Sequence, residues 1–220
     1  MSQSVRQLAG VADGPLPDEF AIAPGVVTNN VDMIAEGRVQ VHIASAPGID
    51  PWARLSSVGG GSGRGFYWVP QLHDEVLVAF AQNDPNSAYV LGGLWSTLSR
   101  PPSLVPVEAP TKRVIKTGVA AGIGHEIEFD DALQSISITT STMQKVTLDP
   151  LAITLSNLAG TLKISLDNTT QSISIQAVNS IDLKAAEISL TGASVAIKAG
   201  SVSVTSAGPC TVTGLPIKLN

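Results

Sequence analysis

Residues 180–207 read SIDLKAA-EISLTGA-SVAIKAG-SVSVTSA, four consecutive units of seven residues. Each unit runs polar, apolar, variable, apolar, polar or charged, and then two small residues. The two apolar residues lie two positions apart, which places both side chains on one face of a strand. A coiled coil is excluded, because its apolar positions lie three and four apart. Each unit is therefore predicted to be one short strand, rich in β-branched residues, followed by a tight corner.

Looser copies of the same pattern precede these units and extend the predicted needle over residues 134–220. They are the apolar pairs Ile136 and Ile138, Val146 and Leu148, Ile153 and Leu155, Ile164 and Leu166, and Ile173 and Ile175. Fixing the backbone of one unit costs roughly 7–14 kcal/mol, whereas burying its two apolar side chains returns about 3–6 kcal/mol. A lone meander would have too few neighbours, so two closures remain open. Three chains intertwine as a prism, or one chain coils with three units per rung.

Composition divides the chain into two regions. The nine aromatic residues all lie at or before Phe129, and the last arginine is Arg113. The net charge of −5 comes without a basic patch, which argues against nucleic-acid binding. The single cysteine, Cys210, excludes an internal disulfide. The start of the chain lacks the apolar core of a secretory signal, so synthesis in the cytoplasm is expected.

The region 22–100 has the pattern of a small closed β-barrel, and residues 1–21 are interpreted as an extended arm. Five or six short runs of apolar residues are separated by turn signals such as residues 83–86, NDPN. The glycine-rich run 59–65 fits no phosphate-binding motif and is predicted to be a flexible loop between strands. The aromatic residues of this region are expected to supply the core of the barrel.

The motifs of this region resemble the OB-fold domain of contractile-tail spikes: phage baseplate spikes, VgrG-like type VI secretion spikes and extracellular contractile injection systems. The residues that carry the resemblance are Gly37, Arg38, Trp52, Ala53, Arg54, Gly65, Phe66, Tyr67, Pro70, Asp74, Glu75, Phe80, Asp84, Gly92 and Leu94. The resemblance implies that they serve packing and loop geometry. It also implies a homotrimer, in which an OB-fold collar joins a hub protein to a triple-stranded β-helix, and it therefore favours the three-chain prism.

Residues 101–133 are predicted to form a linker and neck. Some spikes of this kind carry a lysozyme domain between the barrel and the needle. Fewer than about 40 residues rarely fold alone, so this connector is too short to contain such a domain. Residues 124–131, GHEIEFDD, resemble the opening of the needle in these spikes. They contain His125 and four carboxylates, but strand alternation is expected to place neighbouring carboxylates on opposite faces. A solvated face is predicted, with no metal, cofactor or catalytic residue, because His42, His73 and His125 are dispersed.

The end of the chain resembles the terminal segment of the same spikes. Some phage spikes end in a His-x-His motif that binds iron at the apex, but this chain has no histidine after His125. It is expected to dock a separate tip protein of the PAAR-repeat type. The residues assigned to this contact are Gly214, Leu215, Pro216, Ile217, Lys218, Leu219 and Asn220.

The sequence therefore predicts an all-β, non-enzymatic central spike of a contractile injection apparatus. Its barrel would join the hub, and its trimeric needle would puncture the target envelope after assembly into a phage tail or tail-like particle. The alternative is a tail-fibre or adhesin stalk with a carbohydrate-binding barrel. A cell-wall hydrolase is disfavoured because the sequence shows no acid/base pair.

Overall fold

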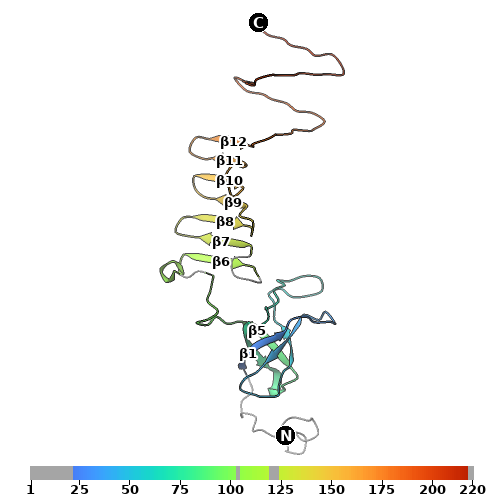
Figure 1. Ribbon diagram of the computed structural model, residues 1–220, viewed down its shortest axis with the longest axis vertical. Helices are drawn as coiled ribbons and strands as arrows, with labels where there is room; N and C mark the ends of the chain where they lie inside the picture. Colours follow the sequence, from blue (N-terminus) through green and yellow to red (C-terminus); the bar gives the residue numbers. More distant parts are fainter. Residues whose placement is uncertain (1–21, 103–104, 119–123, 218–220) are drawn as a thin grey trace, which may run out of the picture. The chain divides into compact units, whose positions relative to one another are not determined.

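The computed structural model describes residues 22–102, 105–118 and 124–217. The predicted arm 1–21 and the last three residues of the predicted tip contact, Lys218, Leu219 and Asn220, lie outside this part. The chain consists of two compact units, each defined by its internal contacts; the first ends at Val178 and the second begins at Asn179. The first unit contains a barrel and a seven-stranded sheet (Figure 1). None of the helices in the described ranges is both long and apolar enough to cross a lipid bilayer.

Five strands close into a barrel in the order β1-β2-β3-β5-β4. They are β1 (Ile22–Asn29), β2 (Arg38–His42), β3 (Trp52–Leu55), β4 (Glu75–Phe80) and β5 (Ala88–Gly93), with a 3-10 turn, η1 (Ala81–Asn83), between β4 and β5. All pairs are antiparallel except β3 with β5, which is parallel. A five-stranded closed barrel of this kind is the architecture of an OB-fold. The prediction of an all-β chain with an N-terminal barrel is confirmed.

The barrel core is built from small and β-branched side chains. Strand alternation turns one residue in two inward, and these inward residues are mostly valines. The buried set is Val27, Val39, Val41, Ile43, Ala46, Ala53, Val76, Val78, Phe80, Ala88 and Val90. Phe80 is its one aromatic member, whereas Phe66, Tyr67, Trp68 and Trp95 are exposed. The expectation of an aromatic core was therefore wrong, because a barrel of five strands has an interior that valines fill.

The second sheet is a meander in which every strand pairs antiparallel with its neighbour in the chain. Its strands are β6 (Lys112–Lys116), β7 (Glu126–Asp130), β8 (Ser135–Thr139), β9 (Lys145–Leu148), β10 (Ala152–Ser156), β11 (Lys163–Asp167) and β12 (Ser172–Gln176). β6, β7 and the 3-10 turn η2 (Pro106–Glu108) fall within the segment interpreted as linker and neck. The strand pairing therefore begins upstream of residue 134.

An aspartate begins the turn after every second strand of the meander. The carboxylate of each accepts hydrogen bonds from backbone amides two to three residues onward, which is the local geometry of an Asx turn. The bonds run from Leu133 N to Asp130 (2.9 Å), from Leu151 N to Asp149 (2.8 Å) and from Thr170 N to Asp167 (2.8 Å). The bond from Thr170 is the main cause of the lowered pKa of Asp167. These turns share one edge of the sheet because consecutive antiparallel strands reverse direction.

The second unit, Asn179–Asn220, has no paired strand among its described residues 179–217. Its backbone bends at Ala186, Gly192–Ala193, Gly200 and Ala207–Gly208, which are the small residues at or next to the end of each seven-residue unit. The corners were therefore predicted at the right positions. Straight legs join them (Figure 1). Without partner strands these legs cannot form the predicted strands, since strand pairing requires a neighbour.

Candidate functional site

The candidate site is one face of the meander, here called the apolar face. The register places seven strands side by side without a bulge, so each strand presents two residues to this face. The residues form two ladders across the sheet. One ladder is Arg113, Phe129, Ile136, Leu148, Ile153, Leu166 and Ile173; the other is Ile115, Ile127, Ile138, Val146, Leu155, Ile164 and Ile175. Thirteen of these fourteen residues are apolar, and Arg113 is the exception.

The apolar face is not covered by any part of the same chain that the structure describes. Its Ile and Leu side chains in β8 to β11 are 37–43% exposed, and Ile173 in β12 is 72% exposed. Covering the exposed part of one such side chain contributes roughly 0.6–1.2 kcal/mol, since full burial contributes about 1.5–3 kcal/mol. Thirteen of them amount to on the order of 10 kcal/mol per chain. Soluble monomers rarely expose a continuous apolar surface of this kind, so the face is a candidate contact surface.

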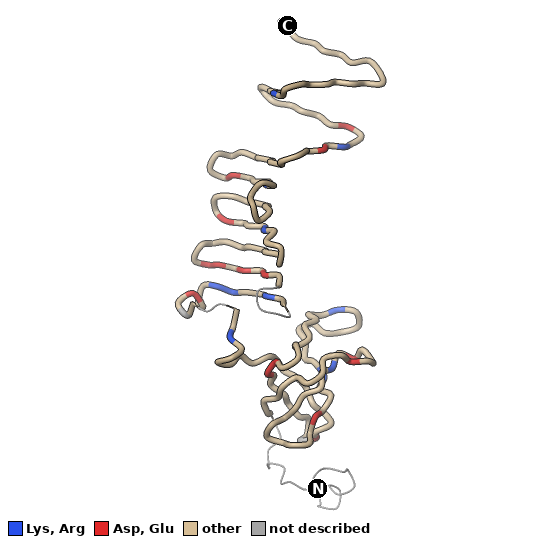
Figure 2. The backbone as a smooth tube through the Cα atoms, in the orientation of Figure 1, with Lys and Arg blue, Asp and Glu red and all other residues tan. Residues whose placement is uncertain are grey.

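The opposite face of the meander is polar, and its charges gather at one end. β6 and β7 carry the charged positions, while β8 to β12 are mostly uncharged (Figure 2). Lys116 Nζ lies 2.7 Å from Glu126. Lys112 Nζ lies 3.1 Å from Glu108, 3.7 Å from Asp130 and 3.9 Å from Glu128. The bond to Glu108, with the nearby carboxylates of Glu128 and Asp130, raises the pKa of Lys112.

The carboxylates of β7 correct one argument made from the sequence. Glu126, Glu128 and Asp130 lie two positions apart and therefore share a face, so alternation did not separate them. Lysines of β6 lie opposite them and neutralise them instead. Among the residues that the structure describes, no group of three or more His, Cys, Asp or Glu side chains could hold a metal ion.

In the barrel, Gly37 and Arg38 lie where the loop that Asp32 organises meets β2. Arg38 donates to both oxygens of Asp32, from Nη2 at 3.1 Å and from Nε at 3.3 Å, and the guanidinium lies 5.6 Å from the ring centre of Trp52. Asp32 also accepts the backbone amides of residues 34, 36 and 38. Gly37 takes a φ of 72°, which an L-residue rarely adopts, and its carbonyl accepts Leu55 N. Asp32 was missed in the sequence, although an Asp in a turn-rich segment is a signal for an Asx turn.

The motif Trp52-Ala53-Arg54 lies on β3, where its side chains alternate between the core and the outer surface of the barrel. Ala53 is fully buried in the core. The side chains on either side of it point outward, where Arg54 lies 5.6 Å from the ring centre of Tyr89 on β5. A cation over an aromatic ring is attracted by the electrons of the ring face. This contact connects β3 with its parallel neighbour on the outer surface.

The glycine-rich run is a hydrogen-bonded hairpin, and the aromatic residues follow it. Gly61 and Arg64 exchange backbone bonds, and Phe66 N donates to Val58 O at 3.1 Å. Gly65 has a φ of 128°, and a Cβ there would lie 2.9 Å from Gly60 Cα. Close backbone packing thus requires glycine at position 65, which the prediction of a flexible loop did not include.

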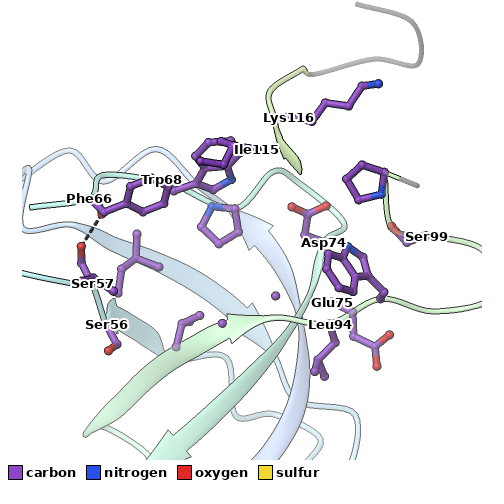
Figure 3. Close-up of a pocket in the computed structure, with 18 of the residues that line it drawn as sticks. Ser56, Ser57, Phe66, Trp68, Asp74, Glu75, Leu94, Ser99, Ile115 and Lys116 are labelled. Atoms are coloured by element: carbon purple, nitrogen blue, oxygen red, sulfur yellow. Dashed lines mark hydrogen bonds between the residues drawn. The ribbon is translucent and has the colours of Figure 1, made fainter. Parts of the chain in front are cut away.

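Phe66 and Trp68 stack beside this hairpin, with ring centres 5.6 Å apart and planes within 7°. The Ser57 hydroxyl donates to the Phe66 carbonyl (Figure 3). Tyr67 is 79% exposed. The two stacked rings line a surface pocket together with other barrel residues, among them Leu55, Val58, Leu94 and Trp95.

The remaining motif residues fix turns and strand ends. The Pro70 carbonyl accepts Asn30 Nδ2 at 3.1 Å, Asp74 accepts Gln71 N at 2.8 Å, and the Glu75 carbonyl accepts Leu94 N at 2.7 Å. Asp84 accepts Asn86 N and the Ser87 hydroxyl, which hold its pKa below the usual value. A Cβ added at Gly92 would meet no atom within 4 Å, so space does not require glycine there.

The described part of the predicted tip contact is exposed. Leu215 is fully exposed and Ile217 half exposed. Gly214 and Pro216 flank Leu215 in the same segment. Nothing in the described part of the chain tests the predicted binding of a tip protein.

Comparison with known proteins agrees with the barrel topology. Residues 23–95, which include β2 to β5 and nearly all of β1, match the family of the type VI secretion system/phage-baseplate injector OB domain. The barrel is similar to this injector OB domain. The resemblance expected from the sequence is therefore confirmed, and the chain is related to VgrG-like baseplate spikes.

Two curated relatives of this chain come from Vibrio cholerae serotype O1. The actin cross-linking toxin VgrG1 is 30% identical over 126 residues, which are 54% of this chain and 11% of that protein. The type VI secretion system spike protein VgrG3 is 29% identical over 109 residues, which are 46% of this chain and 11% of that protein. The chain thus spans about a tenth of the length of these relatives. The actin cross-linking named in the first is a property of that protein.

Proposed function

We propose that this chain is the central spike subunit of a contractile injection apparatus and that it acts as a homotrimer. The uncovered apolar face is the observation that carries the proposal, because thirteen apolar residues in two ladders require a partner surface. The injector OB domain supplies the context, since its family belongs to type VI and phage baseplate machines. A protein of this kind would be structural, and it would be neither a toxin nor a hydrolase.

Identical copies are the partners that best fit the apolar face. Three copies arranged around an axis would turn their apolar faces inward and their polar faces to solvent, as a prism with one wall from each chain. Closed rotational symmetry is the usual solution for soluble homo-oligomers. The alternative closure, a single chain coiling with three units per rung, lacks support in residues 112–176, where every pair joins consecutive strands.

The seven-residue units support the same assembly by a different route. Their apolar side chains are more than half exposed, from 53% at Ile181 to 77% at Val204. Their backbone has no strand partner within the described chain. Legs from neighbouring copies would supply these partners and form a triple-stranded β-helix. Pairing with neighbouring copies would leave no strand edge free along the needle, which also prevents uncontrolled aggregation.

The function that follows is mechanical. A rod stabilised by continuous strand pairing would transmit the force of sheath contraction to the target envelope. The barrel would join the hub protein of the baseplate, and the segment 214–220 would dock a PAAR-type tip. In this arrangement the particle is a phage tail or tail-like machine assembled from cytoplasmically made subunits.

Light scattering on the intact protein tests the central claim. A homotrimer gives three times the 22.7 kDa of one chain. A mass equal to one chain at micromolar concentration would overturn the proposal. The tip contact is tested separately by a pull-down with a PAAR-repeat protein, comparing the full chain with a chain ending at residue 213. Unchanged capture would refute the docking role of residues 214–220 and leave the trimer unaffected.

A further inference from the structure

We infer that Arg113, paired with Asp131, sets the axial register in which copies of this chain pack their apolar faces. This inference rests on the proposed trimer and adds how the copies choose one alignment. Arg113 stands in the first strand of the sheet, directly opposite Phe129 on the apolar face. It is the one charged residue among the fourteen positions of the two ladders.

The rest of the apolar face specifies alignment poorly. From β8 to β12 each strand presents two residues drawn from Ile, Leu and Val, at nearly the same exposure from β8 to β11. If one copy shifts along the axis by two strands relative to its neighbour, strands of the same direction again lie at the same level. Equivalent apolar side chains then face each other. Repetitive strands with uniform faces are known to be weakly specified in register.

The C-terminal end of the ladders does not stop such a slip either. The seven-residue units continue the pattern of two apolar residues two positions apart, beginning at Ile181 and Leu183. The residues that follow β12 in the sequence therefore repeat the pattern and offer no change that would mark one alignment. The pattern changes only at the other end, at β6.

Arg113 is held in place there. Its Nη1 donates to Asp131 Oδ2 at 2.9 Å and to the Pro110 carbonyl at 3.2 Å. Both charged side chains are about two-thirds exposed, so the pair is solvated in a single chain. In the aligned trimer the pairs of all copies would lie at the same level, at the β6 end of the apolar interior, and would keep the solvent contact that they have in a single chain. After a slip of two strands, Arg113 of one copy would face Ile136 and Ile138 of another, and its charge would be desolvated, which is unfavourable.

Disulfide trapping in the full chain tests this inference. The background carries Cys210→Ser, because Cys210 is an exposed free thiol. A tagged chain with Ile138→Cys is co-expressed with an untagged chain with Leu155→Cys, which lies on the same ladder two strands further along. Linked peptides are identified by mass spectrometry. Aligned copies give the 138–138 disulfide, and slipped copies give the 138–155 disulfide.

With Arg113 present, the 138–138 product is expected to dominate. Arg113→Leu is expected to raise the 138–155 share about tenfold or more, the change that about 1.4 kcal/mol of lost discrimination gives. Arg113→Gln, which removes the charge but keeps a polar side chain, provides a second variant if Arg113→Leu fails to fold. Arg113→Lys should preserve alignment. Lys145→Leu, which removes a charge from the polar face, is the matched control and should change nothing.

The outcomes separate this inference from the proposed function. A trimer whose 138–155 share is unchanged by both Arg113→Leu and Arg113→Gln would overturn the register role alone. A trimer with Arg113 that yields no 138–138 product would also overturn it, because the copies would then be slipped if the 138–155 product forms, or joined outside the apolar face if neither product forms. A single-chain mass by light scattering would instead overturn the proposed function itself.

Discussion

Arg38 donates two hydrogen bonds to the carboxylate of Asp32, from Nη2 to Oδ1 at 3.1 Å and from Nε to Oδ2 at 3.3 Å. The pair joins the β1–β2 loop to the start of β2, and the same guanidinium lies over Trp52 on β3. The hydrogen bond with Arg38, together with three backbone amides, lowers the pKa of Asp32 from 3.8 to about 2. One loop aspartate thus connects three strands of the barrel.

The stability of the barrel should depend on Asp32 in a defined pH window. Because the folded pKa is the lower one, the contribution of the ionised carboxylate is complete above about pH 4 and is lost as pH falls through about 2. Asp32→Asn should lower the melting temperature at pH 7, and the difference from the parent should shrink between pH 4 and pH 2. Tryptophan fluorescence follows the barrel, since all three tryptophans lie within residues 52–95. Glu36→Gln is the control, because Glu36 also contacts Arg38 but is well exposed. An equal difference at pH 2 and pH 7 would argue against this role.

Gly25 should tolerate no side chain. A Cβ at this position would lie 2.8 Å from both Ile43 Cδ1 and Val41 Cγ1 in the closed core. Gly25→Ala is expected to destabilise the barrel by about 1–3 kcal/mol, the usual cost of overpacking. The matched control is Gly92→Ala, because a Cβ at Gly92 meets nothing within 4 Å. Denaturant titration measures both variants, and equal midpoints for the two would contradict the packing argument.

A charge on the apolar face should prevent assembly, and a charge on the polar face should not. Leu155 and Thr154 are neighbours on β10 and point to opposite faces. Leu155→Asp should give single chains, because an unpaired carboxylate would be buried among apolar side chains. Thr154→Asp should remain a trimer. Light scattering at matched concentration decides, and the same mass for both variants would exclude this face as the interface.

The seven-residue units should be protected by neighbouring copies. Within the described chain their amides have no strand partner, so protection from hydrogen exchange must come from other copies. We expect slow exchange across residues 180–207 in the intact protein. In Leu155→Asp the same amides should exchange at the rate of unstructured chain, because the single chain offers them no partner. Fast exchange in a protein that is trimeric by mass would show that these legs do not pair.

The sequence predicted the local character of most elements. Apolar residues two positions apart identified the strands β8 to β12, and small residues identified the corners of residues 180–207. These features depend on alternation along one strand, which is a property of neighbouring residues. The core of the barrel was harder to predict, because the volume enclosed by five strands decides that valines enter it and Trp68 does not.

Alternation and motif order by themselves determined that this protein is all-β, with an OB-like barrel followed by repeated short strands. Only the tertiary structure decided which strands pair and in which register, because alternation within one strand does not specify the partner strand. It brought β3 beside β5 and Arg38 onto Asp32. It also aligned thirteen apolar residues in two ladders with Arg113 at their end.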